Sequence, residues 1–365
     1  MTEYAALIPV NVITGFLGSG KTTLLQKLLA SPQLRDTAVL VNEFGEVGLD
    51  HHLLENVAEG TLLLDNGCLC CALRGDLQES LRDLFSRRER GEIPRFQRVV
   101  IETSGLADPV PIAYTVLAEP VIQHHFRLGN IVTTIDTVNG QAQLDHNSES
   151  IKQAAVADRL ILTKTDIASV SQVNALRTQL RRLNAGAVMI DAGAEDLDPV
   201  QILTNDTYDQ ESRSREVGRW LQDEELNSGL TEHKHGLHAH DEIYSFCVSY
   251  DVPFDWTAFG VWMTMLLNRR GDKVLRIKGL LNVAGVATPV LINGVQHIVH
   301  PPVHLDHWPD IDRQSRIIFI VQGLSQQRIE ASLSAFNALA NPVPLSGVPA
   351  VGPAQAASET VVSRP

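Results

Sequence analysis

A phosphate-binding motif stands near the N-terminus. Residues 15–22 read GFLGSGKT and match G-x-x-x-x-G-K-[ST], with an apolar run before them and a helical pattern after them. The glycines would let backbone N–H groups curl around phosphate oxygens, where a side chain would collide. Lys21 would contact the β- and γ-phosphates, and the Thr22 hydroxyl would bind Mg²⁺. The motif predicts a nucleotide site that includes Gly15, Gly18, Ser19, Gly20, Lys21, Thr22 and Thr23.

A second segment supplies an acid and a glycine. Residues 99–105, VVIETSG, form an apolar strand pattern that ends in Glu102 and continues to Gly105. Glu102 could hold the Mg²⁺ shell or polarise the attacking water, and the Gly105 N–H could reach the γ-phosphate. Many strands end in Glu, so this interpretation depends on the neighbouring phosphate motif. With Lys21, these residues form the expected catalytic group.

A third segment resembles a base-reading motif. Residues 163–166, TKTD, follow an apolar strand pattern and are similar to the Asn-Lys-x-Asp motif that reads guanine. The Asp166 carboxylate can accept hydrogen bonds from guanine N–H groups, a pattern that adenine does not present. Thr163 replaces Asn, so one stabilising amide is missing, while Lys164 and Asp166 remain. The motif favours GTP over ATP; the alternative is a solvated Lys/Asp turn.

Thiols form the second chemical group. Three of the four cysteines, Cys68, Cys70 and Cys71, fall within four residues. Thiolates bind Zn²⁺ and other transition metals, and two or three of them with one further ligand would make an open site. Glu43 lies where a GTPase switch I would fall and could join them when the γ-phosphate orders that loop. The expected metal ligands are Thr22 for Mg²⁺ and Glu43, Cys68, Cys70 and Cys71 for the transition metal; small buried cysteines are the alternative.

Eight of the thirteen histidines occur in two clusters. A tract at residues 231–241 is polar and could capture metal weakly, or could be a solvated linker. The second cluster, His297, His300, His304 and His307, surrounds a Pro-Pro loop, and ordinary loop histidines explain it equally well.

The elements that position these residues fall into two domains. Alternating strand and helix patterns over residues 1–204 predict an α/β domain with a parallel sheet of the P-loop NTPase type. Residues 205–241 read as a polar, His-bearing linker. Residues 242–340 predict a smaller α+β domain, and the Pro/Ala/Ser-rich residues 341–365 predict a disordered tail.

Composition excludes several classes of function. The net charge of −13 disfavours nucleic-acid binding, which needs clustered Lys and Arg. No stretch approaches the roughly 20 apolar residues that cross a bilayer, and the N-terminus lacks the basic region and cleavage site of a signal peptide. The expected location is the cytoplasm.

The motifs in their order resemble the CobW-type GTPases, relatives of the urease and hydrogenase nickel-insertion GTPases. The resemblance includes NEFG at 42–45 and GCLCC at 67–71, and in the back half LRIKG at 275–279, GVQH at 294–297 and HWP at 307–309. It implies a GTPase that binds zinc or cobalt through the cysteines and passes the metal to a client metalloprotein, with nucleotide-dependent homo-oligomers as a further expectation. Thr163 and the sparse histidine tract depart from the family pattern.

Three alternatives stay open. The chain could buffer or sense metal with incidental GTP hydrolysis, or it could handle cobalt in cobalamin biosynthesis. A P-loop kinase for a small molecule would prefer ATP, and Asp166 argues against it. We hypothesise a cycle in which GTP and Mg²⁺ order the Glu43 loop against the thiolates and hydrolysis resets the ligands.

Overall fold

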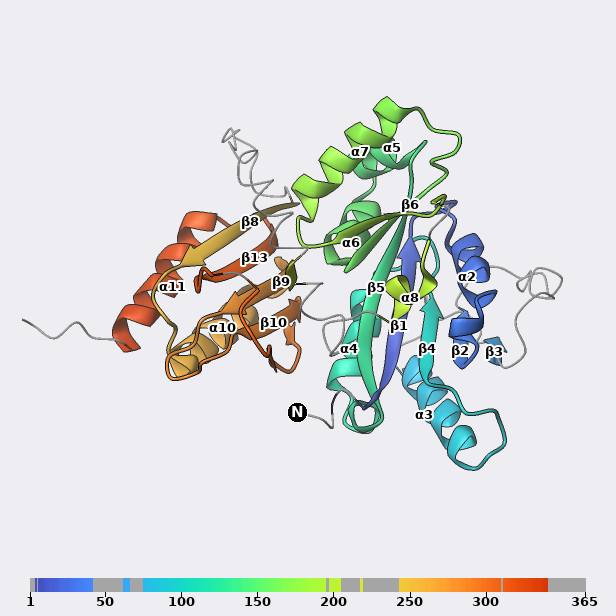
Figure 1. Cartoon of the computed structure of the whole chain (residues 1–365), viewed down its shortest axis with the longest axis horizontal. Helices are drawn as coiled ribbons and strands as arrows, with labels where there is room; N and C mark the ends of the chain where they lie inside the picture. The colour runs from blue at the N-terminus through green and yellow to red at the C-terminus, as the bar shows by residue number, and fades with distance from the viewer. Residues whose placement is uncertain are drawn as a thin grey trace, which may run out of the picture.

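A parallel sheet of seven strands forms the centre of the N-terminal domain. The computed structural model describes residues 4, 6–41, 62–65, 75–194, 197–204, 217–218, 243–309 and 311–340, with only the backbone at 62–65 and 75–76. The strands are β1 (Ile8–Gly15), β2 (Thr37–Val41), β3 (Leu62–Asp65), β4 (Arg98–Glu102), β5 (Phe126–Asp136), β6 (Arg159–Thr163) and β7 (Val188–Asp191). Their order across the sheet is β3-β2-β4-β1-β5-β6-β7 (Figure 1). The order runs in opposite directions from β1, and ligands of such sheets bind beyond the carboxyl ends of the strands at this switch point.

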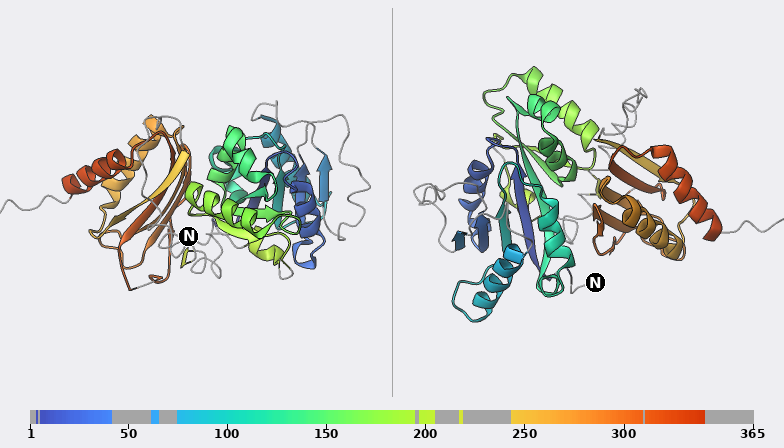
Figure 2. Two further views of the ribbon diagram at one scale, coloured as in Figure 1. Left: turned by 90° about the horizontal axis from the view of Figure 1, so that it is seen from above. Right: turned by 180° about the vertical axis from the view of Figure 1, so that it is seen from behind.

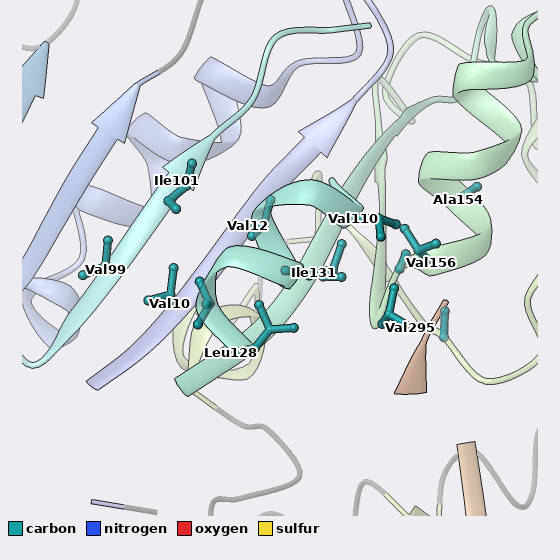
Figure 3. Close-up of a cluster of buried hydrophobic side chains, with 14 of the residues drawn as sticks. Val10, Val12, Val99, Ile101, Val110, Leu128, Ile131, Ala154, Val156 and Val295 are labelled. Atoms are coloured by element: carbon teal, nitrogen blue, oxygen red, sulfur yellow. The ribbon is translucent and has the colours of Figure 1, made fainter. Parts of the chain in front are cut away.

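Helices cover both faces of this sheet. Successive side chains of a strand point to opposite faces, and here both sets are apolar and need to be buried. Val99 and Ile101 of β4 point to one face, and Val100 points to the other. The first core contains side chains of five helices between residues 75 and 183, and Figure 3 shows part of it. The second core contains side chains of the helices at Lys21–Leu29 and Pro199–Leu203. The helices are α2 (Lys21–Leu29), α3 (Gly75–Glu89), α4 (Val110–Ala118), α5 (Gly140–His146), α6 (Ser148–Val156), α7 (Val170–Leu183) and α8 (Pro199–Leu203).

The amphipathic pattern at the C-terminal side of this domain forms the expected helix. Leu176, Leu180 and Leu183 of α7 are buried at helical spacing. Ser169 and Gln172 form a capping box that begins the helix. Together these local signals explain why α7 could be predicted from the sequence.

The C-terminal domain is an antiparallel sheet with two helices on one face. Its strands are β8 (Ile243–Tyr250), β9 (Val274–Leu281), β10 (Val290–Val295), β11 (Ile298–Val299), β12 (Val303–His304) and β13 (Ser315–Gln322), and the helices are α10 (Trp256–Arg270) and α11 (Gln326–Ala340). The order is β11-β10-β9-β13-β8, and β12 pairs with β10. Phe259 and Trp262 of α10 and Leu333 of α11 share a core with the sheet. This is the α+β domain that the sequence predicts.

The opposite face of the second sheet packs against α6 and α7 of the first domain, so the two domains lie side by side (Figures 1 and 2). Leu275, Val295 and Ile320 extend the core of the N-terminal domain across this boundary. Ser245 Oγ donates to the Arg182 carbonyl at 2.7 Å, at the C-terminal end of α7. None of the helices in the described part of the chain is both long and apolar enough to cross a bilayer.

Candidate nucleotide site

The loop after β1 has a backbone that requires glycine. Gly15, Gly18 and Gly20 have φ values of 142°, 71° and 89°, which side chains disfavour. A Cβ on Gly15 would lie 2.3 Å from Thr134 Oγ1 and 2.5 Å from its carbonyl oxygen. Gly20 immediately precedes α2, so the first N–H groups of this helix adjoin the loop. These groups and the helix dipole make an anion site.

Lys21 lies across this loop. Its side chain is buried, and Nζ donates to the carbonyl oxygens of Gly15 at 3.1 Å and Phe16 at 3.4 Å. The ammonium group is therefore held against the backbone of the phosphate loop. The motif residues Ser19 and Thr22 flank it, and the exposed Thr23 follows.

Thr22 and Glu102 meet at the carboxyl edge of the sheet. Thr22 Oγ1 donates to Glu102 Oε1 at 2.7 Å, although the residues are far apart in sequence. Strand pairing fixes this meeting, because β1 and β4 are neighbours with Ile13 opposite Glu102. A hydroxyl and a carboxylate are the hard oxygen ligands that Mg²⁺ prefers, so the donor set fits this ion.

The glycine after β4 touches the phosphate loop. A Cβ on Gly105 would lie 2.8 Å from both the Cα and the backbone N of Leu17. Thr103 extends β4 by donating its N–H to Ile13 O at 2.9 Å, and its hydroxyl donates to Thr14 Oγ1 at 2.8 Å. The structure thus brings Gly105 directly against the loop that contains Lys21, and alanine cannot occupy its place without displacing backbone.

Thr163 is more closely tied to the phosphate loop than the sequence predicts. The missing amide of an Asn is replaced by a hydroxyl, which donates to the Ser19 carbonyl at 2.7 Å and lies 3.2 Å from the Ile135 carbonyl. Ser19 Oγ in turn bonds to Thr134 Oγ1 at 2.7 Å. A tether between the TKTD segment and the phosphate loop therefore exists without the amide.

Lys164 makes a second link between these segments. It has a positive φ of 58°, and Nζ donates to Gly18 O at 2.9 Å and to Asp136 Oδ2 at 2.7 Å. Burial alone would raise the pKa of Asp136, but hydrogen bonds from Lys164 and Asn139 lower it below its ordinary value. The Asp136 charge thus holds Lys164 over the loop, while Asp166 beyond it is exposed.

Two acids of this site were not predicted from the sequence. Asp136 is the last residue of β5, which the sequence does predict as a strand. Its position at a strand end, like that of Glu102 and Thr163, was the signal that could have identified it. Asp191 ends β7, and its Oδ1 accepts from Thr165 Oγ1 at 2.6 Å and from the Gly193 N–H at 2.8 Å. Asp191 therefore joins the loop after β7 to the TKTD segment.

The predicted transition-metal ligands Glu43, Cys68, Cys70 and Cys71 lie outside the described residues, as does the histidine tract at 231–241. Among the residues that the structure does describe, no group of three or more His, Cys, Asp or Glu side chains could hold a metal ion.

The second histidine cluster does not form a metal site within that described part. His297 Nδ1 bonds to the Leu267 carbonyl at 2.9 Å. His300 is buried, and burial with the nearby Arg276 lowers its pKa from 6.5 to about 3. Cationic neighbours disfavour a metal cation there, so packing explains this histidine.

Comparisons with known proteins agree with this geometry. The nucleotide-binding domain of the CobW/HypB/UreG family matches residues 9–191, and the cobalamin synthesis protein cobW C-terminal domain matches residues 243–337. The zinc chaperone YjiA of Escherichia coli is 33% identical over 90% of this chain and 98% of its own length. The zinc chaperone CobW of Pseudomonas aeruginosa is 31% identical over 90% of this chain and 91% of its own.

A solved structure agrees over both domains. The crystal structure of the Zn(II)-bound YjiA GTPase from E. coli superposes with a TM-score of 0.66 at 29% identity and covers 90% of this chain and 99% of that one. Both domains of the chain thus match the CobW-type proteins. The same chain contains the phosphate loop, the Thr22–Glu102 contact and the link between the TKTD segment and that loop. The chain belongs to the CobW/HypB/UreG family of P-loop GTPases and contains the CobW C-terminal domain.

Proposed function

We propose that this GTPase is a metallochaperone that binds zinc at Glu43, Cys68, Cys70 and Cys71 and delivers it to a client metalloprotein in step with GTP hydrolysis. Its relatives are named as zinc chaperones and as zinc-regulated GTPase metalloprotein activators, which supports metal handling in general. Cobalt has a compatible ligand preference, but those relatives favour zinc. We place the protein in the cytoplasm, with homo-oligomers that depend on the nucleotide.

One observation carries the proposal: the ends of β2, β3 and β4 stand in register beside β1, at the edge where the nucleotide would bind. Ile13 is opposite Glu102, Glu102 is opposite Val41, and Val41 is opposite Asp65. Glu43 follows the end of β2 by two residues, and Cys68 follows the end of β3 by three. A chain spans at most about 3.6 Å per residue, so connectivity alone keeps Cys68 within roughly 11 Å of the end of β3.

The roles we propose at the nucleotide follow from the contacts described above. Lys21 neutralises charge on the β- and γ-phosphates, and the Gly105 N–H stabilises the transferring phosphoryl group. Asp166 accepts hydrogen bonds from guanine, in a loop that Thr163 and Lys164 fix against the phosphate loop. Gly15, Gly18, Ser19, Gly20, Thr22 and Thr23 complete the phosphate cradle.

Thr22 and Glu102 would hold Mg²⁺ through their hydroxyl and carboxylate oxygens. When bound with GTP, this ion supplies positive charge that balances the charge on the phosphates. Glu102 is buried at the end of β4 and can also orient the attacking water. Because Glu102 and Val41 are paired residues, a change at the phosphates reaches the strand that leads to Glu43.

The proposed zinc site predicts a specific loss of metal binding. Replacing Cys68, Cys70 and Cys71 together by Ser should weaken zinc binding by at least about 100-fold, since even the loss of outer-shell groups costs up to that factor. The matched control is Cys247→Ser, because Cys247 is the one cysteine in the described residues and is a half-buried side chain of β8, outside the proposed ligand set. Equilibrium competition against a coloured zinc chelator measures both affinities.

The control variant should bind zinc as the wild type does. Tight zinc binding by the triple variant would show that the three cysteines are not the zinc ligands. Loss of zinc from Cys247→Ser would place the site in the C-terminal domain instead.

A further inference from the structure

Helix α6 lies between the turn after β4, which contains Gly105, and the C-terminal domain. It packs against β1 and β5 of its own sheet and against β9 of the second sheet. Figure 3 shows Val156, at its C-terminal end, beside Val295 of β10. Two polar contacts near its C-terminal end, one to the turn after β4 and one to β9, show what this helix could transmit.

The first contact is made by Gln153, which is 1% exposed. Its Nε2 donates to the carbonyl oxygens of Gly105 at 3.2 Å and Ala107 at 2.9 Å. One side-chain amide therefore holds both sides of the turn after β4, which is closed by an Ala107 N–H to Ser104 O bond of 3.2 Å. Because Gly105 lies against the backbone of Leu17, a shift of this turn would displace the phosphate loop.

The second contact is made by Asp158, two residues beyond the end of α6. Asp158 Oδ1 pairs with Arg276 and, at 3.2 Å, with Lys278, both on β9. Its Oδ2 accepts from the Ile131 N–H at 3.0 Å. Although burial alone would raise the pKa of Asp158, Arg276 and Lys278 hold that pKa well below its ordinary value, so the group is a carboxylate. It binds the C-terminal domain to the end of α6.

The chain between these contacts is held firmly. Asn184 follows α7 and is 1% exposed, and its Nδ2 lies 2.9 Å from the carbonyl oxygen of Ala154, 3.1 Å from that of Ala155 and 3.0 Å from that of Ala157, so its two N–H groups are shared among three acceptors. These bonds satisfy the carbonyl groups that a helix end leaves without helical partners. Asn184 thus links the backbone of the segment between Gln153 and Asp158 to the end of α7.

We propose that Gln153 is a positioning residue through which docking of the C-terminal domain at Asp158 sets the Gly105 turn and hence the rate of GTP hydrolysis. The inference rests on the role proposed above for Gly105 at the γ-phosphate. Coupling between two sites is reciprocal in binding, so GTP in turn alters how firmly Arg276 and Lys278 hold Asp158. A client that binds the C-terminal domain would act on hydrolysis by this route.

A double-mutant cycle on the full chain tests the route. Gln153→Met removes the amide that holds the turn and should lower kcat about tenfold while changing GDP affinity less than about twofold, because GDP has no γ-phosphate. Gln179→Met is the matched control, because the amide of Gln179 bonds to an exposed carboxylate, that of Asp145, on α5. It should leave kcat unchanged.

The second member of the cycle is Arg276→Met, which leaves Lys278 to pair with Asp158. It should change kcat about fivefold in the wild-type background and have no effect in the Gln153→Met background. Equal effects in both backgrounds would overturn the relay, and so would a loss of GDP affinity in Gln153→Met as large as the loss of kcat. If Gln153→Met fails to fold, Gln153→Asn, whose shorter amide cannot span both carbonyls, takes its place with the same expectations.

A third variant separates this inference from the proposed site. Gly105→Ala forces the turn away from Leu17 and should abolish most hydrolysis. Normal hydrolysis by Gly105→Ala would refute the role of the turn itself. If Gly105→Ala is inactive but the effects of Gln153→Met and Arg276→Met are additive, only the relay is refuted.

Discussion

Lys21→Ala is expected to lower kcat/KM for GTP hydrolysis by about 100- to 1,000-fold, the usual loss when one preorganised donor is removed from developing charge. The reason is local: the Gly15 and Phe16 carbonyls hold the ammonium group against the phosphate loop, where its charge faces the proposed phosphate site. Phosphate release under steady-state turnover gives the rate.

Lys27→Ala is the matched control for this variant. Lys27 lies on the same helix, is exposed, and donates to the Ala192 carbonyl at 2.7 Å. Its replacement removes the same charge from α2 and should change the rate less than about threefold, because an exposed charge at this distance along the helix is screened. Equal losses in the two variants would mean that net charge, and not the phosphate loop, sets the rate.

Asp158→Asn is expected to destabilise the protein by about 3–5 kcal/mol, because it leaves the buried Arg276 and the half-buried Lys278 without their shared counter-charge. Arg276 has a side chain only 2% exposed, so water cannot replace the lost carboxylate. Urea unfolding at pH 7, followed by circular dichroism, measures the change in the free energy of unfolding.

The comparison variant is Asp312→Asn. Asp312 pairs with Arg316 at 3.2 Å, but its side chain is 43% exposed. Such surface pairs contribute at most about 1 kcal/mol. A loss from Asp158→Asn no larger than that from Asp312→Asn would show that the domain boundary does not depend on the buried ion group.

Much of the nucleotide site could be predicted because its signals are local. The glycines and Lys21 are neighbours in sequence, and Glu102, Thr163 and Lys164 each stand at or just after the end of an apolar strand run. Parallel strands bring such ends to one edge, so order along the chain was enough to group them. The prediction for Thr163 was incomplete, because only the fold shows its hydroxyl reaching the Ser19 carbonyl.

The long-range contacts of Gln153 and Asp158 had no such local signal. Gln153 meets Gly105 across 48 positions, and Arg276 meets Asp158 across 118. A glutamine within a run of small apolar residues reads as an ordinary helix position, and a charge before a strand reads as solvated.

Helix α4 shows a different limit of the sequence. VPIAYTVLA is apolar with little polar pattern, and periodicity alone does not separate a buried helix from a strand.

The central claim, that the nucleotide controls the metal site, is tested most directly by zinc affinity in two nucleotide states. Zinc is titrated into the full chain loaded with Mg²⁺ and either GDP or a non-hydrolysable GTP analogue. The account predicts affinities that differ by about 5- to 150-fold, the range of ordinary coupling between linked sites. Equal zinc affinities in the two states would contradict it.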